Sequence, residues 1–355
     1  MQEHIALLGL VRIDGLGPLR IARLVEGFGS AAAVWHADRQ ALMQAGVPAH
    51  LCAELIKQRA HSDPAAEHTR LWNAGIHVVS VADAHYPPLL RHIAGAPTIL
   101  FVRGSLSGLQ LPTVSIVGTR EPTPYGTDVT RQFAADLAAK GFTIVSGLAI
   151  GVDAIAHQEA LGAGGATVAV LPSGVDCIYP ERNRRLAQAI LAHGQSALVS
   201  EFYPGTKASP PLFPARNRLI SGLSSAVIVT EAGTSSGAHI TVKAALDQGR
   251  DVMAVPGSIY SAKSAGCNAL LTQGAVPVRN AEDVAAYLGF NETPEPEEDP
   301  FLALLHNATH IDELCRLTRR SSAELLGDLL MRELRGEVRD EGHGYFVRQR
   351  TRGDR

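Results

Sequence analysis

The sequence of 355 residues is poor in cysteine, in aromatic residues and in charge of either sign. Its four cysteines form no Cys-x-x-Cys pair, which argues against a zinc site or a disulfide framework; they are Cys52, Cys177, Cys267 and Cys315. No apolar run reaches the ~20 residues that a membrane-spanning helix needs, and no leader pattern opens the chain. We therefore expect a cytoplasmic protein without a membrane segment.

Several signatures of catalysis are also missing. No G-x-x-x-x-G-K-[ST] motif occurs, so ATP hydrolysis has no support. No G-x-G-x-x-G follows a strand pattern, which leaves dinucleotide binding poorly supported. No clustered carboxylates indicate a two-metal nuclease site. These absences favour a protein that is not an enzyme and that needs neither a cofactor nor a metal.

Positive charge is concentrated in one segment. The formal net charge of −3 gives no general attraction to nucleic acid. Between Arg182 and Arg218, however, six lysines and arginines face one acid, Glu201. This basic segment predicts an anionic ligand close to it.

The centre of the chain alternates strand and helix patterns, which predicts an α/β fold. Near-continuous Val, Ile and Leu strands separated by helices are typical of a parallel sheet that is covered on both faces. We expect a Rossmann-like domain with a mostly parallel sheet over residues 81–289. It begins with a Pro-stiffened entry and a short apolar strand at 97–102. Its main strands are expected at 113–117, 143–146, 167–171, 197–201, 226–230 and 252–255.

Residues 1–80 read as an all-helical domain. Gly15 to Pro18 form a tight turn between two helices, and a weaker copy of the pattern covers Met43–Ile56. This resembles a helix-hairpin-helix pair or the related SAM-like bundle. In hairpins that bind DNA, amides of a Gly-x-Gly turn contact phosphates. A module used only for packing is the alternative, because basic residues do not concentrate at either turn.

Two further segments follow the sheet. Residues 290–300 hold five acids and three prolines, which is typical of an extended linker. Residues 301–355 show three helix patterns and then a two-strand pattern, as in a winged helix whose third helix reads DNA. Ten lysines and arginines there face nine acids, so a protein contact is as well supported as duplex binding.

Small and polar residues follow several of the expected strands. They form the turns Gly118–Arg120, Ser146–Asp153, Pro172–Gly174 and Glu231–Gly237. Open α/β sheets bind ligands at the carboxyl ends of their strands, and glycine lets a ligand approach the main chain. Four such turns along one edge predict an extended groove for a polyanion.

The groove has specific candidate contacts. We expect phosphate binding by arginine and lysine, base stacking by an aromatic ring, and anion binding by amides and hydroxyls at a helix N-terminus. The candidates are Arg120, Lys207, Arg216 and Arg218 for phosphate, Phe213 for stacking, and Ser235, Ser236 and Gly237 for the helix N-terminus. Phe213 could instead belong to the core.

Other residues near the groove have structural explanations. One of the two arginines on either side of Asn217 could orient the loop, against Glu231 or Asp153. Glu231 itself is expected to orient an arginine rather than to catalyse. Asp153 and His157 lie four apart on one helix, but no third ligand accompanies them. We expect them to make structural hydrogen bonds rather than to form a metal or acid–base site.

Five motifs in order resemble those of the DNA-processing protein A family (DprA, also called Smf), most clearly over residues 81–289. They are G-T-R-x-P-x-x-Y-G at Gly118–Gly126, S-G-L-A-x-G-V-D-A-x-A-H at Ser146–His157, P-S-G-V-D-x-x-Y-P at Pro172–Pro180, F-P-x-R-N-R-x-I at Phe213–Ile220, and G-C-N-x-L-x-x-x-G-A at Gly266–Ala275.

The resemblance implies a function and a set of partners. It implies binding of incoming single-stranded DNA during natural transformation, and loading of the recombinase RecA onto that DNA past single-strand-binding protein. It also implies a homodimer and no enzymatic activity. By the same resemblance, Arg120 binds phosphate and Lys207, Phe213, Arg216 and Arg218 match the family's basic and aromatic loop. Leu270 and Leu271 are candidates for the dimer interface.

Two other functions compete with this one. A nucleotide phosphoribohydrolase of the lysine decarboxylase-like Rossmann type carries P-G-G-x-G-T-x-x-E. The corresponding turn here, T-E-A-G-T-S-S-G, lacks the paired glycines and the trailing glutamate. A scaffold whose groove binds a protein tail is the second alternative, and the basic segment argues against it.

Overall fold

The computed structural model describes residues 1–290, 300–305, 307–334 and 337–348. The chain forms two compact units, Met1–Gly289 and Phe290–Arg355. The acidic linker expected at 290–300 lies almost entirely outside the described residues. Among the described residues, no helix combines the length and the apolar character that crossing a bilayer would require.

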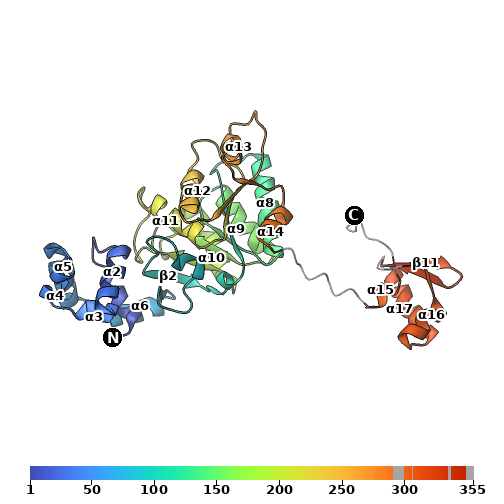
Figure 1. The fold of residues 1–355 in the computed structure, drawn as a ribbon, viewed down its shortest axis with the longest axis horizontal. Coiled ribbons are helices and arrows are strands. Elements are labelled where there is room, and N and C mark those ends of the chain that lie inside the picture. The colour runs from blue at the N-terminus through green and yellow to red at the C-terminus, as the bar shows by residue number, and fades with distance from the viewer. Residues whose placement is uncertain (291–299, 306, 335–336, 349–355) are drawn as a thin grey trace. The chain divides into compact units, whose positions relative to one another are not determined.

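The first unit is built on a nine-stranded sheet of order β1-β2-β6-β5-β4-β3-β7-β8-β9 (Figure 1). From β6 to β9 all neighbours are parallel, whereas β2 pairs antiparallel with both β6 and β1. The mostly parallel α/β fold is therefore confirmed. The strands are β1 (His77–Ser80), β2 (Ile99–Gly104), β3 (Thr113–Val117), β4 (Thr143–Ser146), β5 (Thr167–Val170), β6 (Ala197–Ser200), β7 (Ala226–Val229), β8 (Asp251–Ala254) and β9 (Val276–Pro277).

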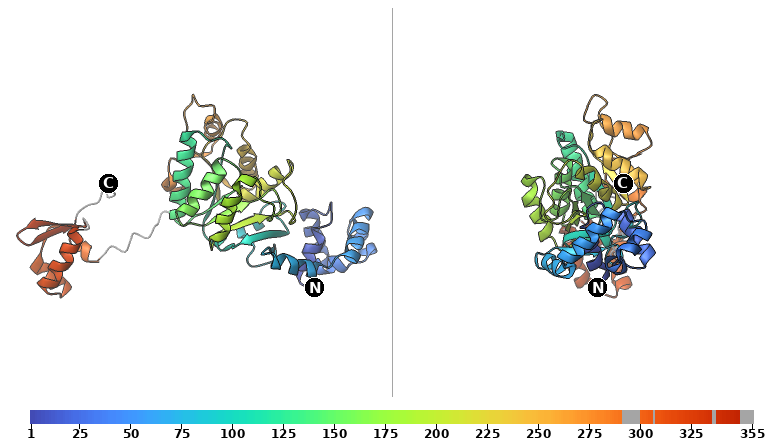
Figure 2. Two further views of the ribbon diagram at one scale, coloured as in Figure 1. Left: turned by 180° about the vertical axis from the view of Figure 1, so that it is seen from behind. Right: turned by 90° about the vertical axis from the view of Figure 1, so that its left-hand side faces the viewer.

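Helices cover both faces of the sheet (Figures 1 and 2). Successive side chains of a strand point to opposite faces. Val227 and Val229 accordingly pack with the helices α11 (Leu212–Gly222), α12 (Ala238–Asp247) and α13 (Ala265–Thr272). Ala226 and Ile228 pack on the other side. That side is covered by α8 (Pro124–Ala139), α9 (Val152–Gly162), α10 (Arg184–Ala192) and α14 (Ala281–Tyr287).

The strand order reverses between β3 and β7. From β3 the chain adds β4, β5 and β6 on one side, and then returns to place β7 on the other side of β3. The two strands are in register, with Val117 opposite Val229 at their carboxyl ends. In open α/β sheets, a crevice for ligands forms at such a switch point.

The N-terminal helices pack against the edge of the sheet. They are α1 (Glu3–Leu10), α2 (Pro18–Phe28), α3 (Ala31–His36), α4 (Arg39–Gln44), α5 (Ala49–His61) and α6 (Pro64–Asn73). The all-helical expectation for residues 1–80 missed β1, a four-residue strand that pairs with β2. Ile99 and Phe101 of β2 belong to the same apolar core as the helices. A domain boundary at residue 80 stays a prediction.

The second unit has the expected order of three helices and a hairpin. These elements are α15 (Pro300–Ala303), α16 (Ile311–Thr318), α17 (Ser322–Leu334), β11 (Val338–Gly342) and β12 (Tyr345–Arg348). A further short strand, β10 (Thr309–His310), completes an antiparallel sheet of order β10-β12-β11. Leu314, Leu329 and Phe346 lie in its core. This small unit matches the winged-helix pattern expected from the sequence.

Phe101→Ala tests whether the helices and the sheet share one core. Phe101 is fully buried, and replacing a buried phenylalanine with alanine costs about 3–5 kcal/mol. We expect urea unfolding followed by circular dichroism to show that loss, and hydrogen exchange to show weaker protection in both α1 and β2. Leu246→Ala is the control, because Leu246 is 63% exposed. Unchanged protection of the N-terminal helices would show that they are stabilised independently of β2.

Candidate nucleic-acid interface

A cleft of about 600 Å³ opens at the carboxyl ends of β3 and β7. Its walls include Gly118–Arg120 after β3, Gly233–Gly237 after β7, and Phe213 and Asn217 of α11. A Cβ added at Gly118 would lie 2.6 Å from the Val152 side chain and 2.7 Å from the Glu231 carbonyl oxygen. Glycine is therefore required there because the strand ends pack so closely. The cleft lies where the strand order predicts a ligand.

Arg120 and two aromatic rings, one half-buried and one exposed, form a cluster at the edge of the cleft. The Arg120 guanidinium carbon lies 5.7 Å from the centroid of the Phe213 ring. Phe213 in turn meets Tyr179 edge to face, with ring centroids 5.5 Å apart. Within the described part of the chain, the exposed Arg120 guanidinium makes no hydrogen bond or ion pair. Its charge and the aromatic surfaces remain available to a ligand.

Lys207 is exposed on the loop between β6 and α11, and its ammonium group has no hydrogen-bond or ion-pair partner among the described residues. The loop is held to the turn that follows β5. The Gly174 N–H donates to the Thr206 carbonyl at 2.9 Å, and the Gly205 N–H donates to the Asp176 carboxylate at 2.8 Å. The backbone beside Lys207 is therefore fixed next to the turn that carries Tyr179.

Arg216 is used for internal contacts, so the predicted phosphate contact is not supported at this position. It is only 4% exposed. Its guanidinium donates to the carbonyl oxygens of Gly147, at 2.6 Å, and Val170. Burial lowers the pKa of Arg216 to about 10, which still leaves it charged at neutral pH. Arg216 is therefore the arginine that orients the loop, as the alternative expected. Its hydrogen-bond partners are carbonyl oxygens rather than Glu231 or Asp153.

Arg218 also points onto internal partners. It forms an ion pair with Glu201 and donates to the Gly95 carbonyl at 2.9 Å. Burial raises the pKa of Glu201, and the neighbouring Arg218 opposes that shift. Arg218 does not line the cleft, so the predicted phosphate contact lacks support here as well. Residues two apart on a helix point about 200° apart, which explains why Arg216 and Arg218 have different surroundings.

Glu231 was expected to orient an arginine, and this was wrong. Its carboxylate accepts hydrogen bonds from the N–H of Thr123 at 2.8 Å and from the Thr123 hydroxyl at 2.6 Å. Thr123 precedes α8, and a carboxylate is favoured near the positive N-terminal end of a helix. A Cβ at Gly126 would overlap the same carboxylate. Glu231 therefore fastens the loop after β3 to the end of β7.

Asp153 and His157 make structural hydrogen bonds, as expected. Asp153 accepts from the N–H groups of Gly147 at 3.1 Å and Ala149 at 3.4 Å, and burial raises its pKa while Arg216 opposes the rise. His157 Nδ1 lies 2.6 Å from the Thr167 hydroxyl. Burial lowers the pKa of His157 to about 3, so the ring is neutral at physiological pH. No group of acids, histidines and cysteines among the described residues could hold a metal.

Ser235, Ser236 and Gly237 lie together in the cleft wall, directly before α12. Ser236 Oγ accepts from the Ala238 N–H at 3.3 Å. The His239 and Ile240 N–H groups also bond, to the carbonyls of Ser236 and Gly237, whereas those of Ser235 and Gly237 have no partner among the described residues and can meet an anion. The structure thus brings this predicted set to the same cleft as Arg120 and Phe213.

Sequence reasoning missed two side chains near this cluster. Tyr179 lies in the motif Pro172–Pro180, but nothing in that motif indicated that its ring would contact Phe213. Lys263 lines the cleft from the loop after β8 and lies 3.4 Å from Glu121. Lys263 follows no recognisable spacing, because only the fold brings its loop to the cleft.

The predicted dimer residues lie largely inside the protein. Leu270 is 7% exposed and belongs to the core under α13, and Leu271 packs against that core. The loop before α13 instead carries Ile259 and Tyr260, which are 82% and 94% exposed. If α13 contributes to a dimer, this loop offers more accessible apolar surface than the two leucines.

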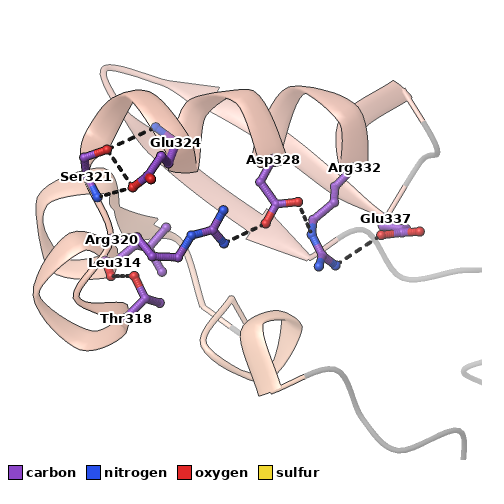
Figure 3. A network of polar contacts seen from close by, with 8 residues as sticks. All are labelled: Leu314, Thr318, Arg320, Ser321, Glu324, Asp328, Arg332 and Glu337. Carbon is purple, nitrogen blue, oxygen red and sulfur yellow. Dashed lines mark hydrogen bonds and ion pairs between the residues drawn. The ribbon is translucent and has the colours of Figure 1, made fainter.

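The helix expected to read DNA in the second unit has its arginine engaged internally (Figure 3). In α17, Asp328 lies 3.2 Å from Arg332, which also lies 3.4 Å from Glu337. Arg320, just before the helix, lies 2.9 Å from Asp328. Ser321 and Glu324 bond to each other across the first turn and cap the helix. Arg320 and Arg332 are thus already paired with carboxylates, and the reading of DNA by α17 stays a prediction.

A family model described as DNA recombination-mediator protein A matches residues 77–289, well over half of the chain. The chain belongs to this family. Protein Smf of Escherichia coli is 38% identical over 296 residues, covering 78% of each chain. Protein Smf of Synechocystis is 39% identical over 283 residues, covering 78% of this chain and 71% of that protein. Members are recombination mediators, not enzymes, which overturns the phosphoribohydrolase alternative.

Solved structures agree with this family assignment. The structure of DNA processing protein A from Streptococcus pneumoniae is 33% identical, with a TM-score of 0.70, and the match covers 81% of this chain and 98% of that one. DNA processing protein A from Helicobacter pylori, whose structure concerns a unique single-stranded DNA binding mode, is 30% identical. Its TM-score is 0.54, over 60% of this chain and 96% of that one. The Streptococcus pneumoniae match covers more of this chain than the family model does, so the likeness extends beyond residues 77–289.

Arg216→Ala and Arg120→Ala should differ in their effect on the stability of the fold. Removing the buried guanidinium leaves the Gly147 and Val170 carbonyls without a donor, so we expect a loss of about 2–4 kcal/mol in the free energy of unfolding. Arg120→Ala should stay within about 0.5 kcal/mol, because its side chain is exposed. Urea unfolding measures both. Equal stability of the two variants would contradict the structural role of Arg216.

Proposed function

We propose that this protein binds single-stranded DNA in the cleft at the carboxyl ends of β3 and β7. The observation that carries the proposal is the position of Arg120, whose free guanidinium lies 5.7 Å from the centroid of the Phe213 ring at the edge of that cleft. A cation beside a partly exposed aromatic ring offers one contact to a phosphate and one to a base. The relative from Helicobacter pylori, with its single-stranded DNA binding mode, supports the same ligand.

The chemistry of the cleft favours a single strand over a duplex. Stacking on Phe213 or Tyr179 needs a base whose face is free, and a duplex hides those faces. Phosphates beside that base would meet the amides and hydroxyls of Ser235–Gly237 across the cleft. Lys207 does not line the cleft, but it is exposed and unpaired among the described residues, so we propose that it meets a phosphate farther along the strand. Because these contacts address phosphates and ring faces, sequence preference should be slight.

We further propose that the bound strand is handed to RecA past single-strand-binding protein, during natural transformation and in the cytoplasm. The description of the family as recombination mediators supports this role. Contacts to the phosphates leave the base edges free for pairing, and this is the state of the strand that a recombinase requires.

Arg120→Ala with Lys207→Ala should weaken binding without unfolding the protein, because both side chains are exposed. Fluorescence anisotropy with a labelled oligo-dT measures the affinity. In single strands each lost phosphate contact lowers the salt slope of the binding constant by roughly 0.7. We expect the double variant to show a shallower slope by about twice that amount. Phe213→Ala should cost about 1–3 kcal/mol of binding and leave the slope unchanged.

Lys243→Ala is the matched control, because Lys243 is an exposed cation on α12 that does not line the cleft. It should bind like the unchanged protein. Wild-type affinity and wild-type salt slope in the Arg120→Ala, Lys207→Ala variant would remove the cleft from the proposal.

We also propose a homodimer whose contact includes the loop before α13. The support is the exposure of Ile259 and Tyr260, since large apolar side chains exposed together are typical of protein interfaces. Leu270 and Leu271 would then support the loop from beneath rather than form the contact.

Sedimentation velocity tests the dimer. The unchanged protein should sediment as a dimer at micromolar concentration, and Ile259→Ser with Tyr260→Ser should shift it to the monomer, because the substitutions remove apolar contact area. Leu246→Ser controls for the loss of an exposed apolar side chain elsewhere, on α12. A monomer in the unchanged protein would end the proposal.

A further inference from the structure

A second cavity, of about 960 Å³, lies among the N-terminal helices. It shares no lining residue with the cleft on the sheet. One wall is α2 with the turn before it, and the other is α4 with the turn that leads to α5. We call it the helical groove. Its lining residues are Gly15, Gly17, Pro18, Leu19, Arg20, Arg23, Leu24, Gly27, Phe28, Ala41, Gln44, Ala45, Gly46 and Val47.

The helical groove is positively charged. Arg20 and Arg23 line it, and no aspartate or glutamate does. Both arginines are exposed, and Arg23 makes no hydrogen bond or ion pair within the described part of the chain. Arg20 donates to the Gly15 carbonyl at 2.7 Å, which holds its guanidinium beside the turn. The groove therefore suits an anion.

At two positions in the helical groove, neither the backbone conformation nor packing requires glycine. Gly15 and Gly46 adopt φ values of 83° and 81°, so their turns require glycine. Gly17 has φ −71° and ψ 169°, which any residue adopts, and Gly27 lies inside α2. A Cβ added at either of these two would meet no atom within 4 Å. Glycine within a helix is also less stable than alanine.

Close approach by a ligand explains both of these glycines. Gly17 precedes α2, in whose first turn Pro18 has no N–H and the Arg20 and Ile21 N–H groups bond to the Gly17 carbonyl. The Leu19 N–H has no partner among the described residues, and a side chain at Gly17 would hinder access to it. Gly27 lies one turn after Arg23 on the same side of α2, because residues four apart share a helix face. Because Gly27 has no side chain, a ligand can reach the helix backbone next to Arg23. Both positions keep the groove open where it is most positive.

The facing wall repeats this arrangement. Ala41 and Gln44 of α4, and Ala45 directly after it, lead into Gly46 and the start of α5. Each wall therefore combines small residues with a glycine turn before a helix. Gly15 of the first turn lies against Leu51 of α5, which brings the two helix starts together. Bare amides and arginines are the groups that position a phosphodiester backbone. Leu19, which is 62% exposed, and Phe28 also line the groove, so an acidic peptide is the other occupant that the test must separate from DNA.

We propose that the helical groove is a second nucleic-acid site, which holds the phosphodiester backbone of DNA through Arg20, Arg23 and the glycine-lined start of α2. It is separate from the cleft on the sheet and does not depend on the function proposed for that cleft.

The test uses the full chain carrying Arg120→Ala and Lys207→Ala, so that the residual binding of DNA comes from other surfaces. Arg20→Ala and Arg23→Ala are added, and anisotropy is measured with a labelled oligo-dT and with a labelled blunt duplex. We expect residual affinity to fall roughly tenfold for at least one of the two probes, with a shallower salt slope. Arg39→Ala is the control, because Arg39 is exposed on α4 outside the groove.

Gly27→Ala gives a readout that a purely structural role would not produce. Alanine stabilises a helix relative to glycine, and the added methyl group has room, so thermal unfolding should move to higher temperature. Residual DNA affinity should nevertheless fall, because the methyl group obstructs the wall. A more stable variant with unchanged DNA binding would contradict the role of Gly27 in the proposal.

Two outcomes would overturn the proposal as a whole. One is unchanged residual binding of both DNA probes after Arg20→Ala and Arg23→Ala. The other is arginine-dependent binding of a labelled polyglutamate peptide with no arginine-dependent binding of DNA, which would assign the groove to an acidic protein partner. Failure of the sheet cleft would appear separately, as an unchanged affinity after Arg120→Ala and Lys207→Ala alone.

Discussion

The buried guanidinium of Arg216 is the contact on which the cleft depends. It bonds to the carbonyls of Gly147 and Val170, at the ends of β4 and β5, and so fixes α11 over the strand ends. The start of α11 carries Phe213, and Phe213 in turn positions Arg120 and Tyr179. A Cβ at Gly147 would lie 2.7 Å from the guanidinium, so the glycine and the arginine require each other. The buried guanidinium of Arg216 thereby helps to position the exposed guanidinium of Arg120.

The main strands could be predicted from sequence because buried parallel strands are continuous apolar runs, such as Ala226–Val229. The function of each arginine could not be. Arg216 and Arg218 share one motif, yet the partners of Arg216 lie 69 and 46 residues away in the chain, and Glu201 lies 17 residues from Arg218. Nothing local distinguishes a cation that bonds to distant carbonyls from one that is free. The four-residue strand β1 was missed for a similar reason, since it is recognisable only through its pairing with β2.

The reason for each glycine could not be predicted from the sequence either. In the sequence, Gly118, Gly147 and Gly17 lie in turns where a ligand could approach, whereas Gly27 carries no such signal. The structure separates them, because a Cβ at Gly118 or Gly147 would strike neighbouring atoms, whereas Gly17 and Gly27 face open space. The first two are explained by packing within the protein. Packing does not explain the other two, and both lie in the same arginine-lined groove.

The net charge of −3 does not show which cations can bind an anion. That depends on whether each lysine or arginine is already paired with a carboxylate. A phosphate that approaches Arg218, Arg320 or Arg332 must displace a carboxylate already in place, so the gain in attraction is offset by the broken ion pair. Arg120, Lys207 and Arg23 have no such competitor within the described residues. Phosphate binding there breaks no ion pair, and the counterions that the DNA releases favour it. Unpaired cations, rather than the count of basic residues, therefore indicate where this protein meets DNA.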